Sequence, residues 1–190
     1  MKPWLILLAG PNGSGKTTLS STKLFQAKIS EFDAIYLNPD EIAKSAPRNC
    51  NALIWSGREI HHQIETAVDN PKSIIVETTL SGKNHLRVIK RCKEADYNIA
   101  LHFVFLSSIE LAQARVALRV NLGGHDVAIE DQLRRYNRSI ANASSIIKYF
   151  DEAFFYNNDS LDGHLLVAEY RRGKFLHSNP SFQKWLPNIE

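Results

Sequence analysis

Short apolar runs recur along the chain, separated by longer segments in which apolar residues recur among polar ones at helical spacing. The apolar runs cover residues 4–9, 34–37, 74–76, 99–106, 154–156 and 165–168. The helical segments cover residues 18–27, 53–68, 86–95, 109–122 and 129–150, the last of which can end before Tyr149. Apolar strands that alternate with amphipathic helices are typical of a buried parallel sheet with helices on both faces. The pattern predicts an α/β fold of three layers, with a central parallel sheet of about five strands.

Length and composition narrow the class of protein. A chain of 190 residues is the size of one domain, at about 100–200 residues per domain. A net charge of +3 does not argue for a nucleic-acid partner, and no apolar run approaches the roughly 18 residues that a membrane helix needs. The two cysteines, Cys50 and Cys92, have no metal-ligand spacing and fit a reducing compartment. We therefore expect a single cytoplasmic domain over residues 1–190, with residues 170–190 as a C-terminal appendage packed onto it.

A complete phosphate-binding pattern follows the first apolar run and leads directly into a helical segment. It reads Gly10-Pro11-Asn12-Gly13-Ser14-Gly15-Lys16-Thr17, with Thr18 as a further nucleotide-binding candidate. Glycines let consecutive backbone amides point at phosphate oxygens, and the start of a helix adds positive potential. In such loops the lysine reaches the β- and γ-phosphates and the last hydroxyl holds Mg²⁺, which gives these roles to Lys16 and Thr17. Because the chain has no NKxD-type guanine motif, we expect ATP with Mg²⁺ as the ligand.

Two polar clusters follow the second and third apolar runs. Ligands of doubly wound sheets bind outside the carboxyl ends of the strands, where these clusters lie. Asp40 can either cap a helix or take the proton of a substrate hydroxyl. The carboxylate of Glu77 is poorly placed for packing in a core. It is well placed to hold a magnesium-bound water or a substrate hydroxyl. Thr78 and Thr79 come next and either bind substrate or shape the turn.

Arginines gather between residues 115 and 138. Arg115 and Arg119 are four residues apart and share a helix face, while a loop with Gly123-Gly124 and His125 precedes three more, namely Arg134, Arg135 and Arg138. Arginines on an amphipathic helix are often a solvated face. A phosphoryl-transfer enzyme nevertheless needs cations for its transition state, and helices hinged at glycine can deliver them on closure. We interpret residues 115–138 as a helical lid, in which His125 either shapes the loop or takes part in catalysis.

Together these segments resemble the zeta-toxin family of P-loop kinases, particularly its small bacterial ATPase-like branch. The matching pieces are AGPNGSGKTT from Ala9, LNPDEIA from Leu37, ETTLSG from Glu77, RVNLGGHDV from Arg119 and RRYNRSIAN from Arg134. They come in the family's order and span roughly residues 4–160. The phosphate loop alone is shared by many NTPases, whereas the ordered set is specific. The resemblance implies a P-loop NTPase fold of the nucleotide-kinase type.

It also implies an activity, the transfer of the γ-phosphate of ATP to a hydroxyl, and the better-known toxins of the family phosphorylate UDP-N-acetylglucosamine at the sugar 3′ hydroxyl. By this resemblance Asp40 matches the general base, Lys16 the phosphate-loop lysine, and Glu77 with Thr79 the substrate-side cluster. The chain departs from the family at Ala128, where a proline is common after GGHDV. Nothing in the sequence fixes a nucleotide-sugar pocket.

The resemblance further assigns two arginines that clamp the transferred phosphate. Arg119 matches the first, and either Arg134 or Arg135 matches the second because the two are adjacent. Residues 156–160, which include Asn158, resemble the family's nucleotide-base loop.

The sequence thus predicts an ATP-dependent kinase with a small-molecule phosphate acceptor. A rival reading is a regulatory switch that hydrolyses ATP slowly and passes phosphate only to water. Another is a toxin–antitoxin component that binds a protein partner such as an antitoxin. Production of ADP that depends on an acceptor separates the first two readings, and a stable complex on co-purification indicates the third.

Overall fold

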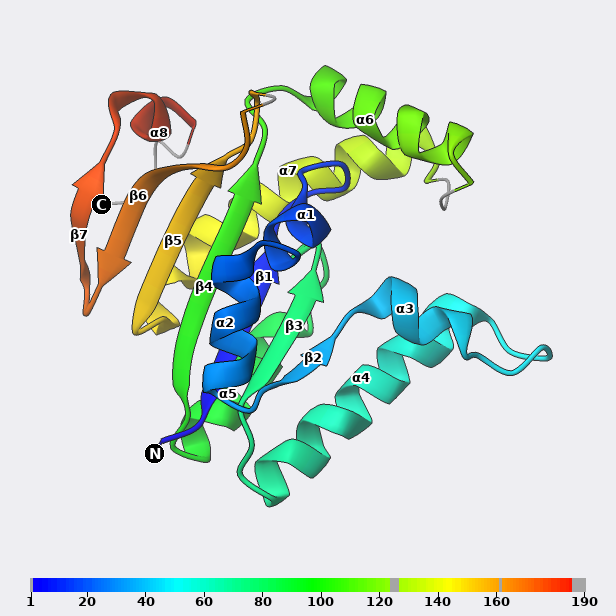
Figure 1. Cartoon of the computed structure of the whole chain (residues 1–190), viewed down its shortest axis with the longest axis vertical. Coiled ribbons are helices and arrows are strands. Elements are labelled where there is room, and N and C mark those ends of the chain that lie inside the picture. Colours follow the sequence, from blue (N-terminus) through cyan, green and yellow to red (C-terminus); the bar gives the residue numbers. More distant parts are fainter. Residues whose placement is uncertain (1, 124–126, 161, 186–190) are drawn as a thin grey trace.

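The computed structural model describes residues 2–123, 127–160 and 162–185. Within these residues the strands form one seven-stranded sheet in the order β2-β3-β1-β4-β5-β6-β7 (Figure 1). The strands are β1 (Trp4–Ala9), β2 (Ile35–Leu37), β3 (Ile74–Thr78), β4 (Asn98–Phe105), β5 (Glu152–Asn157), β6 (Leu165–Arg171) and β7 (Lys174–Ser178). The first five run parallel to one another, whereas β6 and β7 are antiparallel to their neighbours.

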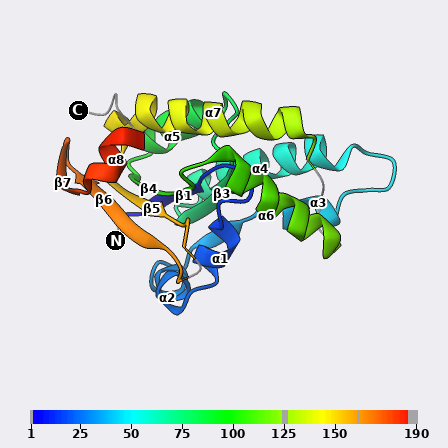
Figure 2. The ribbon, with the colours of Figure 1, turned by 90° about the horizontal axis from the view of Figure 1, so that it is seen from above.

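Helices cover both faces of this sheet. They are α1 (Lys16–Ser20), α2 (Lys23–Glu31), α3 (Pro39–Lys44), α4 (Ala52–Asp69), α5 (His85–Glu94), α6 (Ile109–Asn121), α7 (Ile129–Ile146) and α8 (Pro180–Trp185), with a 3₁₀ turn at Ile147–Tyr149. One face packs against α1 and α2, and the other against α4, α5, α7 and α8 (Figure 2). The buried strands β1, β3 and β4 lie between two apolar layers, as their continuous apolar runs require.

The predicted α/β fold with a largely parallel sheet is confirmed, and two details of the prediction are wrong. Residues 165–168 form a strand, but β6 pairs antiparallel with β5. The helix expected over residues 18–27 is divided, because the side chain of Thr22 accepts a hydrogen bond from Phe25 N at 3.3 Å and begins a new helix, α2. The helix expected over residues 129–150, which can end before Tyr149, ends at Ile146, before the 3₁₀ turn.

The expected C-terminal appendage contributes to the sheet and to the core. β7 extends the sheet beyond β6, and Phe182 of α8 is buried in the larger apolar cluster. Residues 186–190 of the appendage, and Gly124, His125 and Asp126 of the expected lid, lie outside the described residues. No helix in the described part of the chain is long and apolar enough to cross a membrane.

A histidine buried in the sheet makes the stability of the fold depend on pH. His102 of β4 stacks on Phe154 with ring centroids 4.9 Å apart, and burial, followed by the nearby charge of Lys28, lowers its pKa from 6.5 to about 3. Below pH 6.5 the unfolded chain therefore binds a proton that the folded chain does not. The stability that the fold has with His102 neutral is therefore fully present above pH 6.5. The free energy of unfolding falls as the pH drops from 6.5 toward 3.

We expect this single group to lower the free energy of unfolding by about 2 kcal/mol between pH 7 and pH 5. Urea unfolding of the native chain and of His102→Phe at both pH values isolates the effect, since the variant keeps an aromatic ring but cannot be protonated. An equal loss of stability in both proteins would contradict the prediction.

Candidate functional site

The loop between β1 and α1 is folded around glycines at which a larger residue would be strained. Gly13 has φ +76° and Gly15 has φ +97°, in the left-handed region that favours glycine. A Cβ at Gly13 would lie 2.5 Å from the carbonyl oxygen of Ala112 in α6, and a Cβ at Gly15 would collide with Nδ2 of Asn158. The loop is therefore held closely between α6 and the segment after β5, at the carboxyl end of the sheet (Figure 1).

Lys16, the first residue of α1, is only 9% exposed. Its Nζ donates to the carbonyl oxygens of the first two loop residues, at 2.9 and 3.0 Å. Burial lowers the pKa of Lys16, the negative charges of Glu77 and Asp40 oppose this, and the charge of Arg119 adds to it. Groups from β3, α3 and α6 thus act on one ammonium, so these elements converge at the phosphate loop.

The carboxylate of Glu77, near the end of β3, is held on both oxygens. Oε1 accepts a hydrogen bond from Thr17 Oγ1 at 3.0 Å, and Oε2 accepts from Tyr36 OH at 2.7 Å and from Asn38 Nδ2 at 3.1 Å. Burial raises the pKa of Tyr36 to about 12, so its hydroxyl stays protonated and can donate. The buried carboxylate is fixed beside the hydroxyl that ends the phosphate loop.

Asp40 does not cap α3. The cap is Asn38, whose Oδ1 accepts from Asp40 N at 2.9 Å and from Glu41 N at 3.3 Å. The interpretation of Asp40 as a helix cap is therefore wrong. Its exposed side chain lies in the first turn of α3 and faces the same pocket as Lys16.

The structure separates the two adjacent arginines of α7. Arg115, Arg119 and Arg135 line the pocket, and Arg134 does not. Arg134 forms an ion pair with Asp131 at 2.6 Å and its side chain is 55% exposed, whereas that of Arg135 is 32% exposed. Of the two candidates, Arg135 is the one on the pocket side of α7.

The segment after β5 supports the phosphate loop from the other side. Asn158 is buried, and its Nδ2 donates to the carbonyl oxygen of Ser14 at 2.8 Å. His164 Nε2 lies 3.0 Å from the carbonyl oxygen of Gly15. A carbonyl only accepts, so Nε2 carries the proton. Two side chains more than 140 residues away in the sequence thereby fix the conformation of the loop.

Together these residues line a pocket of about 610 Å³ at the carboxyl ends of the parallel strands, a volume within the range of small-molecule sites. Its lining includes most predicted site residues, namely Asn12, Gly13, Gly15, Lys16, Thr17, Thr18, Asp40, Glu77, Thr78, Thr79, Arg119, Arg135 and Asn158. Gly10, Pro11, Ser14 and Arg134 are not in the lining. The first three belong to the backbone framework of the loop.

The two threonines after Glu77 also have structural partners. Thr78 Oγ1 accepts a hydrogen bond from Leu80 N at 3.0 Å, and Thr79 Oγ1 lies 2.8 Å from Ser81 Oγ. Both threonines therefore shape the turn and line the pocket at once.

Ser160 of the expected nucleotide-base loop also lines the pocket. Sequence reasoning missed Leu53, Gly163 and His164 of the lining and Tyr36 behind Glu77, and it gave Asn38 no role of its own. Asn38 carried a usable signal, because an asparagine immediately before Pro39 is a common helix start. His164 carried none, since its contact with the phosphate loop depends on the antiparallel return of β6.

The fold and this pocket define a P-loop, kinase-like, ATP-binding domain. More particularly, the chain belongs to the AAA domain family, whose family model matches residues 5–142. An uncharacterized protein of Haemophilus influenzae is 31% identical over 134 residues, which cover 69% of this chain and 91% of that protein.

Solved structures of low sequence identity share the fold. A chain of the PezAT chromosomal toxin–antitoxin system of Streptococcus pneumoniae superposes with a TM-score of 0.66 at 16% identity, over 88% of this chain and 72% of that one. The AvrRxo1-ORF1:AvrRxo1-ORF2 complex with ATP gives a TM-score of 0.70 at 18% identity over all of this chain. The present chain spans 65% of the length of that AvrRxo1 chain.

Proposed function

We propose that the protein is an ATP-dependent kinase that transfers the γ-phosphate to a hydroxyl of a small molecule. The observation that carries the proposal is the placement of Asp40. An exposed carboxylate at the start of α3 shares one pocket with the buried Lys16 and with arginines of α6 and α7. Such a set provides a base for an acceptor hydroxyl and cations for the phosphoryl group, which a nucleotide-binding site without transfer does not require.

In this mechanism the acceptor oxygen attacks the γ-phosphorus, its bond to phosphorus forms, and the bond to the oxygen that bridges the β- and γ-phosphates breaks. The hydroxyl proton passes to Asp40. Lys16, Arg119 and Arg135 offset the negative charge that develops on the transferred group and on the leaving ADP.

Thr17 and Glu77 fit a magnesium site. Magnesium prefers oxygen ligands and keeps several waters, and the described residues contain no group of three or more His, Cys, Asp or Glu side chains that could bind a metal by themselves. Thr17 would supply its hydroxyl, and Glu77, fixed 3.0 Å from that hydroxyl, would accept hydrogen bonds from metal-bound water. When bound, Mg²⁺ neutralises charge on the phosphates. We therefore place Glu77 on the metal side of the site rather than against the acceptor.

The resemblance to the zeta-toxin family makes UDP-N-acetylglucosamine the first acceptor to test. Asp40, Leu53 and Thr79 line the pocket beyond the phosphate loop, and in this proposal they contact the acceptor. Purified protein is incubated with ATP, Mg²⁺ and a panel of nucleotide sugars and other hydroxyl compounds, with Lys16→Ala as the inactive control. ADP release that rises with one acceptor supports a kinase, and release that ignores every compound favours the slow ATPase.

Tyr36 is expected to act as a positioning residue for the metal side. Tyr36→Phe removes the 2.7 Å hydrogen bond to Glu77, and loss of such outer partners typically weakens metal binding by about 10–100-fold. We expect the variant to need about tenfold more Mg²⁺, while its affinity for metal-free ATP is unchanged. Binding of Mn²⁺ to the protein–ADP complex, followed by electron paramagnetic resonance, measures this without turnover.

Tyr97→Phe is the matched control, because the Tyr97 hydroxyl bonds to the carbonyl oxygens of Ala67 and Lys72. It should lower stability and leave metal affinity unchanged. Equal metal affinity in Tyr36→Phe and the native chain would refute the positioning role.

A further inference from the structure

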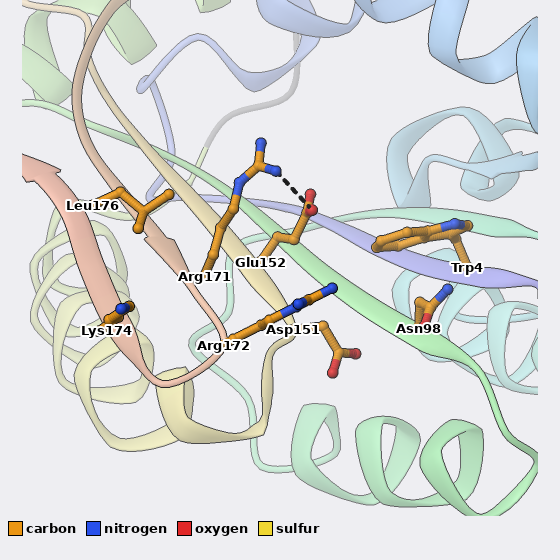
Figure 3. Close-up of a pocket in the computed structure, with 8 residues that line it drawn as sticks. All are labelled: Trp4, Asn98, Asp151, Glu152, Arg171, Arg172, Lys174 and Leu176. Carbon is orange, nitrogen blue, oxygen red and sulfur yellow. Dashed lines mark ion pairs between the residues drawn. The ribbon is translucent and has the colours of Figure 1, made fainter.

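A second pocket lies at the amino ends of the parallel strands, at the end of the sheet opposite the phosphate loop. Its volume is about 560 Å³, and it is lined by Trp4, Asn98, Asp151, Glu152, Arg171, Arg172, Lys174 and Leu176 (Figure 3). These residues lie at the amino ends of β1, β4 and β5 and on the hairpin that joins β6 to β7. None of them lines the phosphate-loop pocket.

The carboxylates of this pocket are already neutralised by other partners. Asp151 pairs with Lys93 at 3.0 Å, and its Oδ2 accepts from Ile99 N at 2.7 Å. Glu152 pairs with Arg171 at 3.4 Å, and Arg171 also bonds to Glu169 at 2.6 Å. Each carboxylate that lines the pocket therefore has an ion-pair partner, although Glu152 shares Arg171 with Glu169.

The remaining side-chain hydrogen-bond donors of this pocket belong to three other residues. Within the described residues, the side chains of Arg172, Lys174 and Asn98 make no hydrogen bond or ion pair. Figure 3 shows Arg172 extended across the pocket toward Asn98 and Trp4, while Arg171 turns to Glu152. The pocket thus presents two cations that form no ion pair, and these two would favour an anion.

Arg172 is held there against its local preference. Arg171 pairs with Lys174 across the hairpin, so Arg172 and Gly173 form a two-residue turn with φ +48° and +90°. Turns of this kind strongly prefer Asn-Gly or Asp-Gly, because a long side chain is strained at positive φ. Two of the other non-glycine residues at positive φ are Asp33 and Asp96, a type that tolerates it. The remaining one in the described part of the chain is Leu80, so a positive φ alone does not mark a function. An arginine at such a position beside a pocket is nevertheless consistent with a role for its guanidinium there.

The aromatic side of the pocket is formed by Trp4. Phe32 packs on its ring with centroids 5.9 Å apart and a 33° tilt, and Phe32 itself does not line the pocket. The indole packs on Phe32 and on the buried apolar cluster that includes Ile6 and Phe25, and it also lines the cavity. An indole of this kind stacks well on a planar ring.

We propose that this pocket binds a nucleoside monophosphate or a similar aromatic phosphate, with the phosphate on Arg172 and Lys174, the ring on Trp4, and the amide of Asn98 on the edge of the ring. The site is independent of the kinase activity proposed above. A guanidinium gives a two-pronged contact to phosphate, which explains why an arginine is kept in a turn that favours asparagine.

The test follows the indole resonances of the ¹⁵N-tryptophan-labelled chain by nuclear magnetic resonance, with Trp4→Phe to assign Trp4. Lys16→Ala serves as the background, so that binding at the phosphate loop does not interfere. AMP and UMP are the probes, and inorganic phosphate and adenosine are added separately. We expect the Trp4 resonance to shift in a saturable way with the monophosphates and far more weakly with phosphate or adenosine alone.

Arg172→Asn should weaken this binding by about 10–100-fold, the scale of a lost charged hydrogen-bond pair. Because Asn-Gly suits the turn, the melting temperature should stay equal or rise, so loss of binding cannot be attributed to misfolding. Lys90→Asn, which removes an exposed charge on α5, is the control and should bind normally.

Three results would overturn the proposal. One is no shift of the Trp4 resonance up to about 10 mM monophosphate, beyond the millimolar range of weak ligands. Another is equal binding by Arg172→Asn. The third is equal affinity for inorganic phosphate, which would show an anion site without a subsite for the ring.

Discussion

Replacing Arg119 by alanine is expected to lower phosphoryl transfer by about 10³–10⁵-fold while the affinity for ATP changes little. Arg119 lines the phosphate-loop pocket, and its charge acts on Lys16. A guanidinium that meets the transferred phosphate stabilises the transition state much more than the bound nucleotide. A surface ion pair is worth at most about 1 kcal/mol, so an effect of this size cannot come from a solvated helix face. Single-turnover rates and ATP dissociation constants separate the two quantities.

Arg134→Ala is the matched control, because Arg134 pairs with Asp131 and lies outside the pocket lining. Its transfer rate should stay near that of the native chain, and Arg135→Ala should be impaired. Arg119→Lys should recover only part of the rate, since a point charge does not reproduce the planar two-pronged contact. Normal turnover by Arg119→Ala would show that α6 presents these arginines to solvent and that the lid hypothesis for residues 115–138 is wrong.

Replacing Asp40 by asparagine is expected to lower phosphoryl transfer by about 10²–10⁴-fold, the usual scale for the loss of a general base. Asparagine keeps the shape of the side chain but cannot take a proton. Because Asn38 caps α3, the substitution should leave the melting temperature and ATP affinity nearly unchanged. Rates at saturating ATP and acceptor, together with thermal unfolding, measure both parts of the prediction.

Glu41→Gln supplies the comparison, since Glu41 is the next residue of α3 and its carboxylate pairs with Lys44 at 2.7 Å. That variant should transfer phosphate normally. If Asp40→Asn retains full transfer, the base lies elsewhere in the pocket and the role assigned to Asp40 fails.

The parallel part of the sheet could be predicted because its strands are buried on both faces. β1, β3 and β4 contain continuous apolar runs, which a single sequence displays directly. β7 could not be predicted in this way. Four of its five residues are polar or exposed, and its one clear anchor is Phe175, which packs against the larger core cluster. The antiparallel direction of β6 depends on the turn after β5. The direction that a turn imposes is harder to recognise in a sequence than a buried apolar run is.

The candidate site shows the same difference between local and long-range information. The phosphate loop is contiguous, so its pattern is visible in eight residues. The adjacent Arg134 and Arg135 differ only in the angle at which they leave α7, which the sequence does not fix until the buried positions Gln132, Tyr136 and Ser139 are known. From the sequence alone, Tyr36 is expected to be a core residue of a short strand. Its contact with Glu77 joins residues that are 41 positions apart, so the sequence does not reveal it.

The destination of the γ-phosphate tests the central claim most directly. With ATP labelled at the γ-phosphate and an acceptor that raises ADP release, ³¹P nuclear magnetic resonance and mass spectrometry can follow the label to its product. A kinase gives a phosphorylated acceptor in an amount equal to the ADP formed, with little inorganic phosphate, and Lys16→Ala gives neither. Release of all the label as inorganic phosphate, whichever acceptor is present, would contradict the account and identify the protein as an ATPase.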